Sequence, residues 1–201
     1  MKRQLLLVMA FALFVVFSAK GQRVAVKNNL LYDALLTPNV SVEVALGEKF
    51  TLDTQLGANY FFYTTNSISP AYTTKKWSHW LLQPEVRYWT CDVFNGWFFG
   101  FHLHGGQMNV GGVNIPFFIL QNKNGMMKNH RYEGYFFGGG ISAGYQLPIS
   151  DRFNMELSLG LGYARLVYDK FKCATCGERE GQGAADYLGP TKSTLSLVYL
   201  F

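Results

Sequence analysis

Charged residues are scarce in this chain of 201 amino acids: Asp, Glu, Lys and Arg together account for 15% of it. Nucleic-acid binding needs a concentrated basic face, which this composition does not require, so we predict no nucleic-acid partner. Long apolar runs are also missing, since only residues 5–17 come near the roughly 20 apolar residues of a membrane-spanning helix. Cysteine occurs three times, which is too few for a disulfide scaffold.

The first 21 residues are typical of a secretory signal peptide. Lys2 and Arg3 precede the apolar run at 5–17, which is too short to span a bilayer, and Ala19 and Gly21 are small residues at the positions that a signal peptidase reads. We predict a signal peptide at 1–21 and one mature domain at 22–201, with no lipid anchor because no cysteine lies near the cleavage site. The leader carries three of the 18 basic residues and no acidic one. The mature chain therefore keeps 15 basic against 13 acidic residues, a net charge of +2.

Aromatic residues and glycine are abundant, at 16% of the chain and 21 residues respectively. An exported chain with this composition and no spanning helix is either a secreted all-β domain or a transmembrane barrel. Alternation of apolar and polar side chains predicts eight strands. They lie at residues 24–35, 39–46, 50–62, 77–89, 97–106, 135–147, 153–164 and 191–201. Pro84 removes one ladder hydrogen bond from the fourth strand and predicts a bulge there.

The connections between these strands alternate in length. Those after the second, fourth and sixth strands are short, whereas long loops follow the third strand at 64–76, the fifth at 110–131 and the seventh around Cys173 and Cys176. Short turns on one side and long loops on the other are typical of outer-membrane barrels. We therefore expect an all-β fold, an eight-stranded antiparallel up-and-down transmembrane β-barrel, located in the outer membrane.

Two aromatic bands follow from these strand directions, as expected for girdles at the two membrane interfaces. The periplasmic band contains Trp89, Trp97, Tyr145, Phe153, Tyr199 and Phe201. The outer band contains Tyr32, Tyr60, Phe62, Trp77, Trp80, Tyr135, Phe137, Tyr163 and Tyr168. The last strand also ends on Phe201 with Tyr199 two places before it, which resembles the signal by which the outer-membrane assembly machinery recognises its clients. We expect that machinery and the outer-membrane lipids to be partners.

The opposite strand faces carry charged and imidazole side chains, which we expect to form a polar network in the lumen. Its predicted members are Lys27, Glu43, Asp53, Glu85, Arg87, His102, His104 and Glu156. An eight-stranded barrel is about wide enough inside for its own side chains, and buried charges must pair, so this network should plug the lumen. A small pore is the alternative. His102 and His104 share one face, but spacing places no third ligand, so we predict neither a metal nor a cofactor.

The long loops carry three further features. Cys173 and Cys176 are expected to form a small disulfide in an oxidising envelope, while Cys91 lies at the opposite rim and cannot pair with them. Apolar residues in the longest loop form a candidate partner site, unless they fold over the barrel mouth or extend the fifth strand; they are Ile115, Phe117, Phe118, Ile119 and Leu120. Basic residues at the outer rim suit the phosphates of lipopolysaccharide; they are Lys75, Lys76, Lys123, Lys128, Arg131, Lys170, Lys172 and Lys192.

The stretch KNNLLYD, from Lys27 to Asp33, occurs together with this strand order and the terminal Phe201. In combination they resemble a domain-of-unknown-function family of small outer-membrane proteins, within the wider group of OmpA- and OmpX-like eight-stranded barrels. The resemblance covers the whole mature chain and supplies no catalytic residues. It implies a surface-assembly or anchoring role, because such proteins are encoded beside fimbrial genes in some Gram-negative bacteria. A surface or fimbrial protein is therefore a further expected partner.

The leading functional prediction is a non-enzymatic outer-membrane protein whose outer loops contact a partner, glycan or lipid. An outer-membrane lipid-modifying enzyme is one alternative, but it needs a nucleophile and a base within reach of each other. Ser78 and His79 are the only adjacent pair near the outer rim, and neighbouring strand residues point to opposite faces. A soluble lipocalin-like barrel is the other alternative. It would bury the apolar faces around a ligand, and the two aromatic bands disfavour it.

Overall fold

The computed structural model describes residues 23–64, 75–111, 130–172 and 177–201. The predicted signal peptide, the candidate partner residues between Ile115 and Leu120, and the predicted disulfide of Cys173 with Cys176 all lie outside these ranges. Within the described ranges, no helix is long and apolar enough to cross a membrane.

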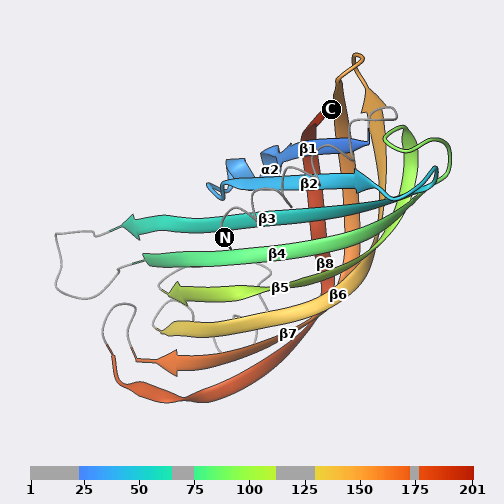
Figure 1. The fold of residues 1–201 in the computed structure, drawn as a ribbon. Coiled ribbons are helices and arrows are strands. Elements are labelled where there is room, and N and C mark those ends of the chain that lie inside the picture. The colour runs from blue at the N-terminus through green and yellow to red at the C-terminus, as the bar shows by residue number, and fades with distance from the viewer. Residues whose placement is uncertain (1–22, 65–74, 112–129, 173–176) are drawn as a thin grey trace, which may run out of the picture.

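Eight antiparallel strands follow one another in chain order, each pairing with its sequence neighbour, and the last pairs with the first (Figure 1). The strands are β1 (Val24–Asn29), β2 (Asn39–Ala45), β3 (Phe50–Thr64), β4 (Lys75–Trp89), β5 (Gly96–Gly111), β6 (Arg131–Pro148), β7 (Phe153–Phe171) and β8 (Arg179–Leu200). The result is one ring-like sheet. This confirms the all-β, up-and-down arrangement of eight strands that the alternation predicts.

The ring has two different ends. At one, which we call the turn end, the connections 46–49, 90–95 and 149–152 are short. At the other, the loop end, lie the longer connections from β3 to β4, from β5 to β6 and from β7 to β8. The connection from β1 to β2 is also at the loop end and contains the one helix in the described ranges, α2 (Leu30–Ala34).

The helix α2 corrects the prediction of a first strand reaching residue 35. The Asn29 side chain accepts a hydrogen bond from the Leu31 amide at 3.1 Å and so caps the helix. Asparagine is a preferred residue at this position because its side-chain oxygen satisfies an amide that has no partner within the helix. The alternating pattern of Leu30 and Tyr32 with their neighbours suggested a strand, and the local cap decided against it.

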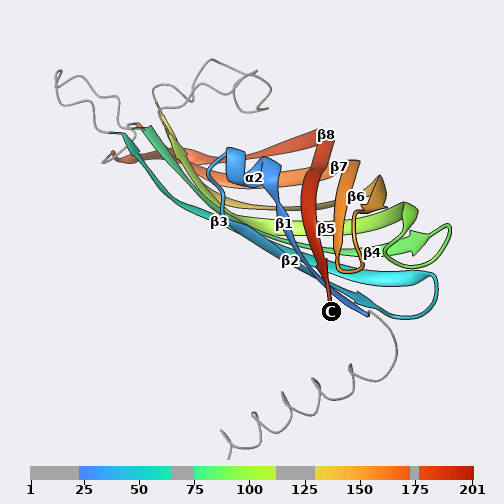
Figure 2. The same cartoon turned by 90° about the horizontal axis from the view of Figure 1, so that it is seen from above.

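Strand length differs sharply around the ring. β1 and β2 have six and seven residues, whereas β7 and β8 have 19 and 22. The pairing of β1 with β8 ends at Asn29 opposite Ser196, and that of β2 with β3 ends at Asn39 opposite Gly57. Towards the loop end, the sheet therefore continues only from β3 through β8. α2 lies against β8 where β1 stops (Figure 2).

The last strand is twice as long as predicted and contains a bulge. β8 begins at Arg179 rather than at residue 191, and its pairing with β7 shifts between Gly160 and Leu161. One extra residue, Thr191, is inserted there, so the alternation reverses along the rest of the strand. The bulge predicted at Pro84 is wrong, because Pro84 pairs with Thr54 in unshifted register.

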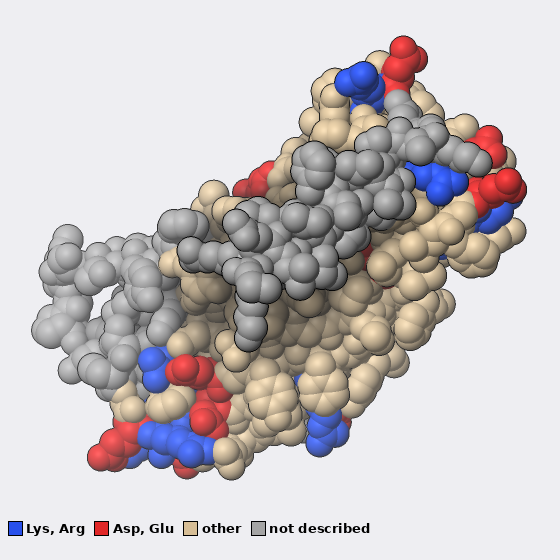
Figure 3. Space-filling view, in the orientation of Figure 1, with Lys and Arg blue, Asp and Glu red and all other residues tan. Residues whose placement is uncertain are grey.

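The distribution of side chains is the reverse of that in an ordinary soluble domain. Apolar residues such as Ile141, Leu159 and Leu161 face outward and are 68%, 65% and 63% exposed. The interior instead holds fully buried charged and amide side chains, namely Arg87, Glu43, Glu85, Glu156, Gln83, Gln146 and Asn59. In Figure 3, charged residues on the face drawn gather mainly towards its two ends, and the part of the surface between them that is not covered in grey is mostly uncharged.

Among the predicted aromatic band residues whose side chains the structure describes, most face outward and four do not. Exposed members include Trp97, Tyr145, Phe153 and Phe201 at the turn end and Tyr60, Tyr135, Phe137 and Tyr163 towards the loop end. The four exceptions are Trp89, which is fully buried, Trp77 and Tyr32, which line an internal cavity, and Tyr168, which packs on Tyr132. Alternation along β4 explains the inward position of Trp77 and Trp89, because both residues lie on the same strand face as Glu85 and Arg87.

Candidate functional site

The interior has three layers, and the lowest is an aromatic floor at the turn end. Trp89 and Phe98 are fully buried, with ring centroids 4.9 Å apart, and Phe94 packs on Trp89 at 6.1 Å. Trp89 Nε1 donates a hydrogen bond to Thr51 Oγ1 at 2.9 Å. A Cβ on Gly144 would overlap the Phe98 ring, so a residue without a side chain is required where β6 passes this floor.

Arg87 is the centre of the second layer, a network of buried charges. Its guanidinium lies 3.0 Å from Glu43, 2.9 Å from Asp53, 2.5 Å from Glu85 and 2.9 Å from Glu156. These carboxylates come from β2, β3, β4 and β7, so one side chain links four strands. The planar fork of arginine suits such multiple contacts, and its face also lies 4.3 Å from the centroid of Phe98 in the floor.

Two lysines complete the network. Lys27 contacts Glu43 and Glu156, the latter at 2.6 Å, and Lys192 lies 2.7 Å from Glu85 and 3.5 Å from Asp53. Each of the four carboxylates therefore touches at least two of the three cations. Hydroxyl groups supply further hydrogen bonds: Thr51 donates to Glu43, Ser41 to Asp53 and Ser142 to Glu85. Buried charges are tolerated under these conditions, when they are paired and their remaining acceptor sites are filled.

The structure brings together six of the eight predicted network residues in this layer: Lys27, Glu43, Asp53, Glu85, Arg87 and Glu156. His102 borders the layer and forms a hydrogen bond through Nε2 to Thr191 Oγ1 at 2.9 Å, while His104 lies higher, in the wall of a cavity. Sequence reasoning missed Lys192 and placed it on the outer rim, which is wrong, because it is only 3% exposed. The signal was available, since Lys192 has the same parity as Thr194 and Ser196 on the inward face.

The remaining predicted site residues lie apart from this network. The His102 and His104 rings are 5.7 Å apart, and in the described ranges no group of three or more His, Cys, Asp or Glu residues is arranged so that it could hold a metal ion. Tyr199 and Phe201 form an outward aromatic pair at the turn end, with centroids 4.8 Å apart. Cys91 is an exposed free thiol in the turn between β4 and β5.

The loop end is not uniformly basic, although its lysine and arginine residues predict a basic rim. Lys170 lies 2.9 Å from Glu180, and Arg131 lies 3.7 Å from Glu133. The hydrogen bond from Lys170 lowers the pKa of Glu180 below its ordinary value. Two of the basic residues predicted for the rim are therefore paired with acids on the protein itself.

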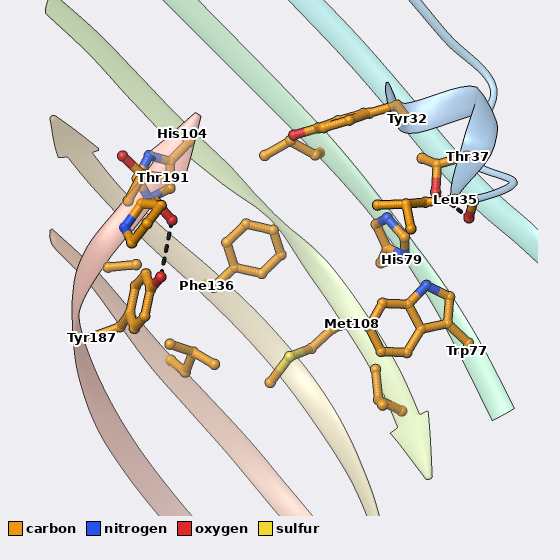
Figure 4. Close-up of a pocket in the computed structure, with 15 residues that line it drawn as sticks. Tyr32, Leu35, Thr37, Trp77, His79, His104, Met108, Phe136, Tyr187 and Thr191 are labelled. Atoms are coloured by element: carbon orange, nitrogen blue, oxygen red, sulfur yellow. Dashed lines mark hydrogen bonds between the residues drawn. The ribbon is translucent and has the colours of Figure 1, made fainter. Parts of the chain in front are cut away.

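The third layer is an apolar cavity of about 430 Å³ that lies between the charged network and the loop end (Figure 4). Its walls come from α2 and from every strand between β4 and β8. Apolar and aromatic groups dominate the lining: Leu35, Trp77, Leu81, Met108, Val110, Phe136, Ala164, Leu166, Tyr32, Tyr187 and Pro190. The polar lining residues are Thr37, His79, His104 and Thr191. Sequence reasoning did not predict this cavity, because it treated the whole inward face as polar.

The KNNLLYD stretch builds the side of this cavity. Asn29 Nδ2 donates to the Ser193 carbonyl at 3.1 Å, and Asn29 Oδ1 accepts from the Leu195 amide at 3.2 Å. Both groups belong to the edge of β8 that β1 no longer covers. Asn39 Nδ2 in turn donates to the Asn29 carbonyl and to Asp33, at 2.9 and 3.0 Å. The two asparagines therefore attach α2 to the open edge of the sheet.

Two histidine nitrogens in the cavity region have no partner. His79 Nδ1 and His104 Nδ1 are buried without a hydrogen bond to any described residue, although both side chains line the cavity. Such groups are uncommon in folded proteins, and a water molecule or a ligand can supply the partner. Ser78 and His79, the pair considered for catalysis, are consecutive residues of β4, and only His79 contributes to the cavity lining.

Comparison with known proteins gives one match. No curated protein and no solved structure is significantly similar to the chain. The sequence matches the DUF3575 family, described as a protein of unknown function, over residues 6–201. This confirms the predicted membership of a domain-of-unknown-function family. Because the match covers nearly the whole sequence, the chain belongs to the DUF3575 family.

Proposed function

We propose that this protein is an integral outer-membrane β-barrel with a closed lumen, which serves as an anchor or interaction protein at the cell surface and not as an enzyme. One observation carries the proposal: the outward strand faces are apolar and exposed, while the interior is charged and buried. A bilayer makes the first property favourable, since lipid chains solvate apolar side chains. The ring of paired strands satisfies most of the backbone polar groups, as a bilayer requires.

The alternative of a soluble lipocalin-like barrel fits these residues poorly. In water, Leu157, Leu159 and Leu161 on β7 would form a continuous exposed apolar row. Exposed patches of this kind cause association in soluble proteins. Neighbouring strands add Phe99, Phe101, Leu103, Ile141 and Leu147 to the same outer surface.

Two layers support the closed lumen. The floor of Trp89, Phe94 and Phe98 blocks the turn end with apolar side chains, and the Arg87 network fills the middle. An ion or small solute would have to pass both. We therefore expect no stable single-channel conductance in planar bilayers, and discrete, reproducible steps would overturn the closed lumen.

Surface interactions are assigned to the loop end, because the turn end has only short connections. The longer connections at the loop end include residues 112–129, with the apolar stretch from Ile115 to Leu120. We propose a surface or fimbrial protein and the lipopolysaccharide as partners there. Tyr199 and Phe201 are proposed as contacts for the barrel assembly machinery, since they form an outward aromatic pair.

A charge on the outer surface tests membrane insertion. A transmembrane strand needs about 9–11 residues, so Leu159, six residues from the start of β7, falls near the middle of the bilayer. Leu159→Arg should lower the stability of the folded protein by about 2–4 kcal/mol in a bilayer. At an exposed site in water, the same substitution should change the stability by no more than about 0.5 kcal/mol. Gln182→Arg, near the loop end of β8, is the matched control.

The measurement is the folded fraction in the outer-membrane fraction, read from the shift in electrophoretic mobility on boiling. Wild type and Gln182→Arg should show the shift, and Leu159→Arg should show much less of the folded form. If the wild type stays in the soluble fraction without a shift, or if both variants behave alike, the membrane-spanning proposal fails.

A further inference from the structure

The apolar cavity is the feature that the proposed function does not use. It is made by side chains that face inward but are not polar, and it lies directly above a charged network. Its volume of about 430 Å³ is in the range of small-molecule sites, which typically measure about 300–1,000 Å³ and are lined mainly by apolar groups with a few polar ones. An anchor with a closed lumen has no need of such a space.

The cavity reaches the outer surface at its side. Leu35 and Pro190 line it and are also exposed, Leu35 at 70%, so the wall between α2 and β8 gives access from outside. The edge of this opening is apolar, because Leu36 and Leu188 next to these residues are 57% and 85% exposed. The opening exists because β1 and β2 end early and leave β8 without a neighbour on that side. Figure 4 shows α2 and β8 on opposite sides of the cavity.

The polar groups of the cavity lie at two places. Thr191 and His104 lie just above the network, where Thr191 Oγ1 already contacts His102. His79 lies closer to the loop end, level with Met108, its partner across the β4–β5 ladder. The Nδ1 atoms of His104 and of His79 are unpartnered, and a neutral imidazole nitrogen can donate to or accept from an oxygen atom. The apolar groups Met108, Phe136 and Leu166 lie beyond His104, in the direction of the loop end.

We propose that this cavity binds a free long-chain fatty acid or fatty alcohol, with its oxygen end at His104 and its hydrocarbon chain along Phe136 and Leu166. A hydrocarbon chain suits the apolar wall, and the head oxygen supplies the partner that the His104 imidazole lacks. A narrow single chain also fits an opening between one short helix and one strand. Entry from the lipid phase rests on the proposed membrane location, whereas binding in the cavity does not.

Photolabelling tests the proposal with the whole protein in lipid nanodiscs. The probe is palmitic acid with a photoreactive diazirine on its chain, and labelled residues are mapped by mass spectrometry. We expect labels on the inward residues Met108, Phe136 and Leu166, and an excess of unlabelled palmitate should remove them. Labels on the outward Ile141 and Leu161 report contact with the surrounding lipid and should not respond to the competitor.

Two alanine-to-phenylalanine substitutions distinguish binding in the cavity from contact with the outer surface. Ala164→Phe fills the cavity, because Ala164 lines it and is 7% exposed, whereas Ala143→Phe places the same ring on the outward face of β6. The inward labels should be lost in Ala164→Phe and retained in Ala143→Phe. His104→Leu should raise the palmitate concentration for half-maximal inward labelling about tenfold, the factor that corresponds to one lost hydrogen bond.

The outcomes are distinct for the two proposals. Outward labels without competable inward labels, in a folded protein, would overturn the binding site and leave the membrane location intact. Inward labelling by a photoreactive phospholipid but not by the free acid would also overturn it, in favour of a resident membrane lipid. Loss of the outward labels alone would refute the membrane location, while the competable inward labels would still support the site.

Discussion

Replacing Arg87 by methionine removes the one side chain that contacts all four buried carboxylates. Methionine is unbranched and fills similar space, so the change acts mainly on charge. The four carboxylates would then face only Lys27 and Lys192, and the formal charge of the network would fall from −1 to −2. Removing one partner of a buried ion pair typically costs about 3–5 kcal/mol, because the other charge stays buried without compensation. We expect a loss of stability of this size for Arg87→Met.

The assay is urea unfolding of the refolded protein in detergent micelles, followed by tryptophan fluorescence. Trp89 lies in the floor beside the network and should report its disruption. With slopes of about 1–3 kcal/mol per molar urea, the midpoint should fall by on the order of 2 M. Arg152→Met is the control, because Arg152 lies in an exposed turn and its hydrogen bond to Tyr199 is 3.2 Å long. It should change stability by less than about 0.5 kcal/mol.

A second substitution tests whether charge is the cause. Glu156 makes two hydrogen bonds to Arg87, at 2.9 and 3.0 Å. Adding Glu156→Gln to Arg87→Met removes one uncompensated carboxylate, so the double variant should regain part of the lost stability. Arg87→Met with a midpoint equal to that of the Arg152→Met control would refute the reasoning, since it would mean that water or mobile ions neutralise the network.

Three further substitutions test other parts of the interior. Gly144→Val should lower the free energy of unfolding by about 1–3 kcal/mol in the same assay, because the new side chain overlaps the Phe98 ring. Ala143→Val, on the outward face, should change it very little. Equal effects of the two substitutions would contradict the packing of the floor. Asn29→Ala should cost about 1–2 kcal/mol, since it removes the cap of α2 together with two hydrogen bonds to β8, and a neutral result would show that α2 does not need this attachment. Lys192→Met should destabilise the protein less than Arg87→Met does, because Arg87 still contacts Asp53 and Glu85, the two carboxylates that lose Lys192. The reverse order of unfolding midpoints would show that Arg87 is not the centre of the network.

Period-two alternation in the sequence was sufficient for most of the ring. It located all eight strands and assigned Lys27, Glu43, Asp53, Glu85, Arg87 and Glu156 to one face, and these residues meet in the structure. Alternation carries this information because a strand side chain can point only to one face or the other. The pairing of the six residues could not be read in the same way, since it depends on the stagger between strands.

Local backbone features limit what alternation can predict at two places. The cap at Asn29 changes a predicted strand into α2, and the bulge at Thr191 reverses the faces of β8 beyond it. One inserted residue is enough to exchange inward and outward positions, so the alternation around Leu188 and Tyr187 could not be extrapolated from the strand end. Proline was a weaker signal, because Pro84 fits the sheet without a change of register.

The sequence by itself determined the class of fold, the number and order of the strands and the polar character of the middle of the lumen. These depend on the periodicity of neighbouring residues, which is a local property. Only the tertiary structure decided that Arg87 links four strands, that Trp89 forms a floor and is not part of the predicted periplasmic band, and that an apolar cavity lies under α2. Each of these depends on which residues of distant strands reach the same height in the ring. That height is set by strand length, register and bulges, and no single stretch of the sequence contains it.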